Sequence, residues 1–358
     1  MRILMKLALF LQQYRHGYVF VFALSYPFIL ISNGVRIVFH FPYDEHEFAL
    51  MIAQLILLGI LHIWCYALPK ALSGIQVING LLVAESNSST EVRDLVEANK
   101  SWSNPFSLKD ASGFGRFIKL LYPLLWIVEA VFVGYGLYYF EFIPISRWSG
   151  RLTFFLLIIV FIVGEPSYYL SVWLTYILHK ISHIKKISYD REKPSSTTLF
   201  RVLQKDESNV SIAFLIISIL CVAAYITVAI VAAHNQYLLA RVQQHRLLLA
   251  LLSIAILIPT MLSYFVLLVA PKLFLDRLLS HWKDDIISTS SARKTLLLSK
   301  ETLSPAEEKE LNAINERIDK VMAERIQIPR REVLISIIAI VTDISTIVIN
   351  VLLVTDRL

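Results

Sequence analysis

Long apolar runs constrain this chain more than any other feature. A helix needs roughly 20 apolar residues to cross the hydrocarbon core of a bilayer. Runs of that length are spread over the whole sequence, at about 18–41, 48–69, 120–141, 152–178, 210–233, 247–270 and 333–355. With 56% hydrophobic and only 17% charged residues, the composition is typical of polytopic membrane proteins. We therefore predict an all-α fold, a polytopic transmembrane bundle of about seven helices.

The Lys and Arg residues predict how such a bundle is oriented, because cytosolic loops carry an excess of them. If the N-terminus lies inside, the predicted inside segments hold 28 of the 34 Lys and Arg residues, and the predicted outer ends hold the other 6. This distribution predicts an N-inside, C-outside topology. It also explains the net charge of +6 without a nucleic-acid partner. The expected partner is the lipid bilayer of the plasma membrane, or of the inner membrane in a bacterium.

The polar segments between the runs divide the chain into regions, and the basic ones among them are expected to be cytosolic. The predicted regions are a basic amphipathic lead-in at 1–17, transmembrane helices 1–6 over 18–271 with cytosolic inserts at 71–115 and 179–208, a cytosolic helical hairpin at 272–332, and helix 7 at 333–358. Within the second insert, a break is expected at Pro194.

The second arm of the hairpin has a defined predicted start. Ser304, Pro305 and Glu307 combine an N-cap serine, a proline at the first helical position and a glutamate at the third. The arm then carries a seam of apolar residues at 3-4 spacing: Leu311, Ile314, Ile318, Val321 and Ile328. Such a seam requires a partner helix. The partner is either a neighbouring subunit or the first arm, through Leu275, Leu278, Leu279, Trp282 and Ile286.

Three carboxylates, Glu129, Glu165 and Asp343, lie near the centres of different apolar runs. A carboxylate at that depth is costly unless it faces water or a partner, and it marks a functional site by default. No Lys or Arg lies near these midpoints to balance the charge. Pro166, which follows Glu165, removes a backbone hydrogen bond and can free a carbonyl beside the carboxylate. The acids are candidates for a cation or proton path, and protonated acids in dry packing are the alternative.

The last apolar run has one polar face. Ser336, Ala339, Asp343, Thr346 and Asn350 recur at 3-4 spacing, which places them on one side of a helix. In a membrane, a stripe of small and polar residues turns toward other helices or water. The stripe either lines a path for water and ions or forms a dry packing seam, and the sequence leaves both interpretations open.

Two further clusters carry ionisable side chains. Asp44, Glu45 and Glu47 form an acidic outer turn that either concentrates cations at a pore entrance or is simply solvated. His179 and His183 lie one helical turn apart, but no third ligand is evident nearby. We therefore predict no metal site and no cofactor.

The run at 120–141 contains a short motif of known type. Val133-Gly134-Tyr135-Gly136 resembles the selectivity-filter signature of potassium channels, and Trp126–Glu129 resembles the end of that family's pore helix. The resemblance implies a loop that re-enters the membrane from outside. However, Phe132 stands where the family has Thr, and Leu137 stands where it usually has Asp. On the alternative interpretation, the two glycines permit close packing of a helix that spans the bilayer.

Enzyme signatures are absent: the sequence has no Gly-rich phosphate loop, nucleophile elbow, HExxH motif or paired Cys motif. We expect instead a homo-oligomeric cation-conducting channel, in which helix 7 lines a path for monovalent cations or protons. The layout resembles that of insect odorant and gustatory receptor channels, although 333–355 lacks the aromatic and Gln motif of their last helix. The alternatives are a proton-coupled transporter or receptor-like module, and a non-conducting membrane scaffold or effector that acts through its hairpin.

Overall fold

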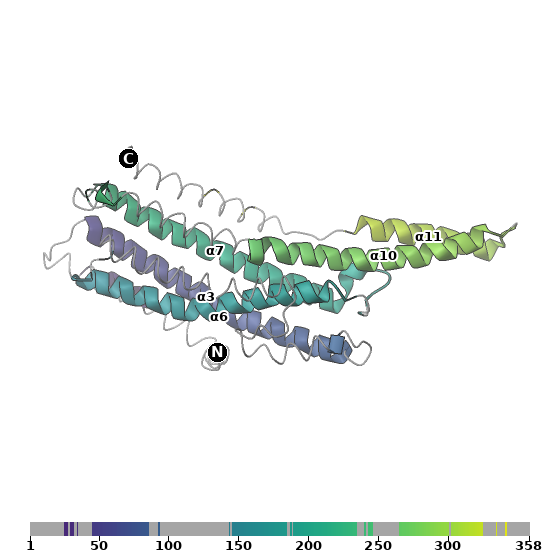
Figure 1. Cartoon of the computed structure of the whole chain (residues 1–358), viewed down its shortest axis with the longest axis horizontal. Helices are drawn as coiled ribbons and strands as arrows, with labels where there is room; N and C mark the ends of the chain where they lie inside the picture. The colour runs from purple at the N-terminus through teal and green to yellow at the C-terminus, as the bar shows by residue number, and fades with distance from the viewer. Residues whose placement is uncertain are drawn as a thin grey trace.

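The computed structural model describes a set of long helices (Figure 1). The described residues are 25–27, 29–31, 34, 45–85, 92–93, 143, 145–184, 187, 189–234, 240, 243–245, 265–300, 302–324, 334 and 341. Their main elements are α3 (Glu45–Glu85), α6 (Trp148–Ile181), the 3-10 helix η2 (Pro194–Ser196), α7 (Thr198–His234), the π-helix η3 (Phe265–Val269), α10 (Ala270–Leu298) and α11 (Pro305–Ala323). Regular structure in these residues is helical throughout, which confirms the all-α prediction.

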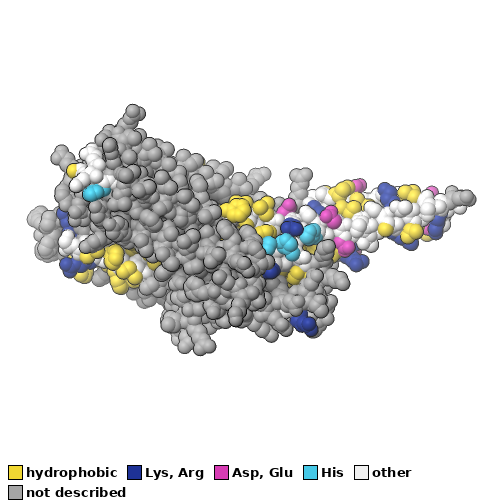
Figure 2. All heavy atoms as spheres, viewed as in Figure 1, with side chains coloured by type: hydrophobic (Ala, Val, Ile, Leu, Met, Phe, Trp, Pro, Cys, Tyr) yellow, Lys and Arg dark blue, Asp and Glu magenta, His cyan; other side chains and the backbone are white. Residues whose placement is uncertain are grey.

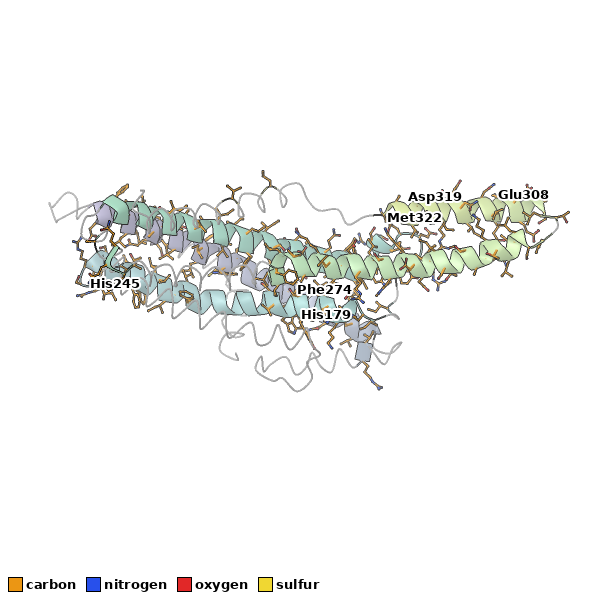
Figure 3. The ribbon with its side chains drawn as sticks, turned by 45° about the horizontal axis from the view of Figure 1, so that its top comes forward. His179, His245, Phe274, Glu308, Asp319 and Met322 are labelled. Atoms are coloured by element: carbon orange, nitrogen blue, oxygen red, sulfur yellow. The ribbon has the colours of Figure 1, made fainter. Side chains whose placement is uncertain are left out.

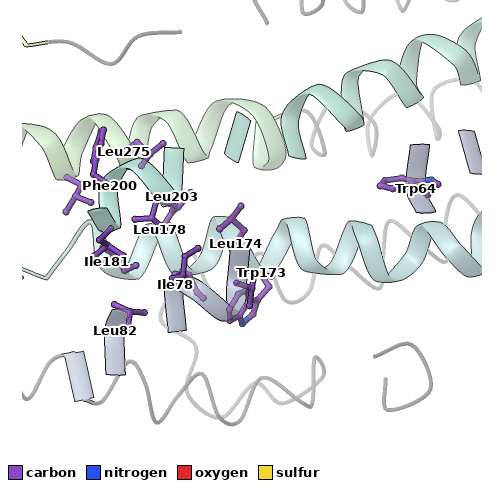
Figure 4. Close-up of a cluster of buried hydrophobic side chains, with 14 of the residues drawn as sticks. Trp64, Ile78, Leu82, Trp173, Leu174, Leu178, Ile181, Phe200, Leu203 and Leu275 are labelled. Carbon is purple, nitrogen blue, oxygen red and sulfur yellow. The ribbon is translucent and has the colours of Figure 1, made fainter. Parts of the chain in front are cut away.

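Three of these helices, α3, α6 and α7, lie side by side as a bundle (Figure 1). Large apolar side chains from all three helices and from α10 share one core (Figure 4). Gly164 of α6 lets Trp64 of α3 approach closely, because a Cβ at Gly164 would lie 2.9 Å from the indole Nε1. The side chains therefore interlock across the helices, and dispersion contacts hold the bundle together.

One stretch of the described residues is long and apolar enough to cross a membrane. It is Glu47–Tyr66 of α3, which is 20 residues long and more than half buried inside the molecule. The apolar stretches Ser73–Val83 and Trp148–Phe161 are shorter. The helical class is thus confirmed, whereas the seven-helix transmembrane bundle and its orientation stay predictions.

Helix α3 is longer than the sequence analysis predicts. The predicted span ends at 69 and a polar insert is expected from 71, but α3 continues to Glu85. Ile75, Ile78 and Leu82 repeat at 3-4 spacing and are almost completely buried in the core of the bundle. Packing of this apolar face extends the helix, so the insert at 71–115 begins as a helix.

Helices α10 and α11 form an antiparallel hairpin that extends beyond one end of the bundle (Figure 1). The predicted start of α11 is confirmed. Ser304 Oγ accepts a hydrogen bond from the Glu307 backbone N–H, and Glu307 Oε2 accepts one from the Ser304 N–H at 2.9 Å. Arg293 donates to both carboxylate oxygens of Glu310, at 2.8 and 3.1 Å, and so links the two arms. Lys300 also pairs with Glu307.

The two halves of α10 have different partners. Leu275, Leu278, Leu279 and Trp282 pack into the core cluster of the bundle. The later half, which contains Arg293, lies along α11. The seam of α11 therefore has a partner within the chain, but four of its five predicted partner residues face the bundle instead. Both halves of α10 carry apolar residues at helical spacing, so their different partners arise from tertiary packing.

Candidate functional site: the junction of α6, α7 and α10

The chain enters α10 through the π-helical turn η3 instead of a regular α-helical turn. Pro271 follows at the start of α10. Proline has no N–H, and its ring clashes with the carbonyl four residues earlier, here that of Leu267. A π turn relieves such a clash by widening the helix, and π turns are frequent at functional sites. The η3 turn is therefore the centre of the candidate site.

Two buried hydroxyl groups bind carbonyl oxygens of this turn. Thr175 Oγ1 of α6 lies 3.0 Å from the Val266 carbonyl and 3.1 Å from the Ser171 carbonyl of its own helix, and its hydrogen is shared between them. Ser211 Oγ of α7 lies 3.4 Å from the Leu267 carbonyl and 2.7 Å from Glu207 Oε1. Glu207 is itself buried. Side chains from two neighbouring helices thus satisfy backbone groups that the irregular turn exposes.

The hydroxyl of Ser211 has a single hydrogen for two acceptors. The shorter distance is to Glu207 Oε1, so this hydrogen is donated mainly to the carboxyl group, and the contact with the Leu267 carbonyl is the weaker one.

A second contact region lies where loop 189–197, between α6 and α7, meets the hairpin. The Asp190 carboxylate accepts hydrogen bonds from the N–H groups of Glu192 and Lys193 and from Ser196 Oγ, at 2.7–3.2 Å. These bonds, that from Ser196 first, hold the pKa of Asp190 below its usual value. The predicted break at Pro194 is confirmed, because this residue begins η2. The loop is thus a defined surface for the hairpin to contact.

Trp282 of α10 is the centre of this contact region. Its side chain is 2% exposed and stacks on Tyr189, with ring centroids 5.3 Å apart. Phe200 of α7 packs on it at 5.9 Å. The Tyr189 hydroxyl donates to Asp285 Oδ2; burial, and then this bond, raise the pKa of Tyr189 to about 12. One indole thus joins the loop, α7 and the hairpin.

The end of α11 contacts the same loop. Glu324 Oε2 accepts a hydrogen bond from the Ser195 N–H at 3.3 Å, and Lys283 Nζ donates to the Glu324 carbonyl. Arg317 Nη2 donates to the Arg191 carbonyl at 2.8 Å. The chain is therefore bound to the loop and to α10 shortly before predicted helix 7 begins.

Helices α3 and α7 make a close contact at Gly74. A Cβ at this position would overlap the carboxyl group of Asp206, so a larger residue there would displace that side chain. Asp206 Oδ2 is buried and has no hydrogen-bond partner among the described residues. Burial raises the pKa of Asp206 to about 6, and the neighbouring Lys205 only partly opposes this rise. Removing the carboxyl group should therefore be well tolerated.

Most of the predicted site residues lie outside the described residues: Ser336, Asp343, Thr346, Asn350, Glu129, Asp44, Val133, Gly134, Tyr135 and Gly136. Glu165 lies in α6, which continues through Pro166 as one helix, but its side chain is not described. The same holds for Glu45 at the start of α3. The cation path through these residues stays a prediction.

Glu47, the remaining residue of the predicted acidic turn, lies within α3 and is 1% exposed. Its Oε1 lies 3.6 Å from Arg147 Nη1, next to the start of α6. Gln54, two turns further along α3, is fully buried; its Nε2 donates to the Ser149 carbonyl at 3.1 Å and to Thr153 Oγ1 at 3.0 Å. These polar contacts join the predicted outer ends of α3 and α6. The sequence analysis missed Gln54, although an amide within an apolar run is a recognisable signal.

The arrangement of these contacts is suited to mechanical coupling between the hairpin and the bundle. His179 and His183 lie with ring centroids 4.5 Å apart, but the part of the chain that the structure describes contains no group of three or more His, Cys, Asp or Glu side chains arranged to hold a metal ion.

No protein-family model matches the chain, and neither a curated protein nor a solved structure is significantly similar to it.

Proposed function

We propose that the chain is a multi-pass protein of the plasma membrane, or of the inner membrane in a bacterium, that assembles as a homo-oligomeric cation channel. Predicted helix 7, at 333–355, lines the path. Asp343 sets the cation preference, and Thr346 and Asn350 coordinate partly hydrated ions. Glu129 and Glu165 adjust the electric field along the path.

One observation carries this proposal: α11 ends at a set of contacts directly before the segment that contains Asp343. Glu324 is bonded to loop 189–197 through Ser195 and to α10 through Lys283. In this proposal, a displacement of the hairpin relative to the bundle acts on predicted helix 7 through the contacts of Glu324. A hairpin linked in this way to a polar, acid-bearing helix is suited to gating.

The π turn supports the same interpretation from the other arm of the hairpin. Thr175 and Ser211 bind its carbonyl oxygens from α6 and α7. An α-helix has few side-chain contacts to its backbone, whereas here two neighbouring helices bind the turn that leads into α10. Motion of the hairpin can thus be transmitted to the bundle by exchange of a small number of hydrogen bonds.

The substitution Asp343→Asn tests the proposal. The protein in liposomes should carry potassium or sodium ions down an imposed gradient, and the variant should lose flux or cation preference by about tenfold or more. The reason is that a carboxylate attracts a cation 4 Å away with an energy of roughly 4 kcal/mol at the effective dielectric near a protein surface. Asp319→Asn makes the same chemical change on the exposed face of α11 (Figure 3) and should leave flux unaltered. Unaltered flux and selectivity in Asp343→Asn would remove helix 7 from the path.

The same assay distinguishes the alternative functions. Flux that requires a proton gradient would identify a proton-coupled transporter. A folded protein without any flux would favour a non-conducting scaffold that acts through its hairpin. The observation that supports a scaffold is the exposure of apolar side chains on the hairpin, namely Leu296, Leu298 and Met322.

A further inference from the structure

Basic side chains of α6 and α10 gather on one surface at the base of the hairpin (Figure 2). Two helices contribute to this basic cluster, which consists of His179, Lys180 and His183 at the end of α6 and Arg277 and His281 on α10. The α6 and α10 members are held together by a ring contact, because His179 packs against Phe274 with ring centroids 4.9 Å apart (Figure 3). Arg277 and His281 follow Phe274 at helical spacing and lie on the same side of α10.

The charged groups that act on His179 are cationic. Burial, and then the charges of His183, Lys180 and Arg277, lower the pKa of His179 to about 4. No carboxylate is among the groups that shift this pKa. An anion placed beside the cluster would therefore be attracted by Lys180 and Arg277 together.

Two exposed members of the cluster can bind a ligand. His183 Nδ1 lies 2.7 Å from the His179 carbonyl and donates to it, so Nε2 becomes a second donor when the imidazole is protonated beside an anion. Arg277 is exposed and offers a planar set of N–H donors that matches a phosphate. Carboxylates lie at the other end of the cluster: the exposed Asp284 and Asp285 follow His281 by three and four residues, whereas Arg277 lies about two helical turns nearer the start of α10.

An exposed apolar stripe leads from the predicted membrane to the cluster. Phe265, Val269 and Leu273 recur every four residues before Arg277, and all three are between 44% and 56% exposed. The predicted sixth span ends at 270, so the stripe lies within and at the edge of the bilayer and Arg277 lies just outside it. A surface that changes from apolar to basic at this depth matches a lipid with an acidic headgroup.

We propose that this surface binds the phosphate group of an anionic phospholipid from the inner leaflet. Arg277, Lys180 and His183 bind the phosphate, and an acyl chain lies along the exposed apolar stripe. The cytosolic leaflet is the anionic one, and basic pockets between helices on that side bind such headgroups. The site rests on the membrane location of the proposed function and on the N-inside orientation predicted from the sequence, and it does not rest on ion conduction. A bound lipid would link α6 to α10 at the base of the hairpin.

Ligand-dependent melting of the full chain in detergent tests this site. The probes are dioctanoyl phosphatidic acid, dioctanoyl phosphatidylcholine and inorganic phosphate. We expect phosphatidic acid alone to raise the melting temperature in a saturable way. The double variant His183→Gln/Arg277→Gln should bind it about tenfold more weakly, because charge-assisted hydrogen bonds are lost. Lys309→Gln, which removes one charge from the exposed face of α11, should bind it as the unaltered chain does.

The other outcomes are equally decisive. If inorganic phosphate raises the melting temperature equally, the ligand is not a lipid. If phosphatidylcholine raises it equally, the basic side chains do not select an anionic headgroup. Undiminished affinity in the double variant would exclude this surface. If that variant does not fold, Arg277→Lys serves instead: it keeps the charge but loses the paired donors, and unchanged affinity would again count against the site. Lipid binding without ion flux would contradict the channel alone.

Discussion

Replacing Trp282 with alanine is expected to separate the hairpin from the bundle and to lower stability by about 3–5 kcal/mol. The indole is buried against Tyr189 and Phe200, so its removal leaves a cavity where the loop, α7 and α10 meet. The melting temperature in detergent should fall. Hydrogen exchange should become faster in α10 and α11 than in α3, because α10 loses its contact with loop 189–197 and α7, whereas α3 keeps its packing against α6 and α7.

Leu298→Ala is the matched control for this substitution. Leu298 lies at the end of the same helix and is 57% exposed, so its truncation should change stability by less than about 0.5 kcal/mol. Equal effects of the two substitutions would mean that Trp282 does not join the hairpin to the bundle. Faster exchange throughout the chain would mean that the hairpin and the bundle unfold as one unit.

Gly74→Ala is expected to push α3 and α7 apart and to lower stability by about 1–3 kcal/mol, the usual cost of overpacking. The added methyl group would overlap the Asp206 carboxyl group, which is buried between the helices. Elsewhere in a helix, replacing glycine with alanine raises stability by about 1 kcal/mol, so a loss of stability at Gly74 would point to the close contact. The change in stability is measured as a shift of the melting temperature in detergent.

Gly80→Ala provides the control on the same helix, because a Cβ there meets no atom within 4 Å. It should be neutral or stabilising by up to about 1 kcal/mol. Adding Asp206→Ala to Gly74→Ala should restore most of the lost stability, since it removes the group that the methyl displaces. Similar melting temperatures for the two glycine variants would contradict the close contact of α3 and α7.

Features that depend on local sequence were predictable. The start of α11 follows from Ser304, Pro305 and Glu307, whose side chains and backbone complete their own hydrogen bonds. The break at Pro194 follows from the restricted backbone of proline. The all-α class follows from apolar runs whose length and composition suit helices. None of these features requires knowledge of which helices become neighbours.

Features that depend on tertiary neighbours were not predictable from one sequence. Thr175 and Ser211 are ordinary hydroxyl residues until α6 and α7 are placed against the π turn. Pro271, near the end of an apolar run, was the available signal for an irregular turn. Likewise, α3 passes the predicted membrane boundary because Ile78 and Leu82 find partners in the core of the bundle, and the seam of α11 pairs with the outer half of α10 for the same reason.

Thiol labelling along predicted helix 7 tests most directly whether the polar stripe faces water. Cys65 and Cys221 are first replaced by alanine, and single cysteines are then placed at Asp343, Thr346 and Asn350 or on the opposite face at Val341 and Val348. In liposomes, a water-soluble thiol reagent should react quickly at the first three positions and slowly at the other two. Slow reaction at all five positions, or equal reaction on both faces, would contradict a water-lined path through this helix.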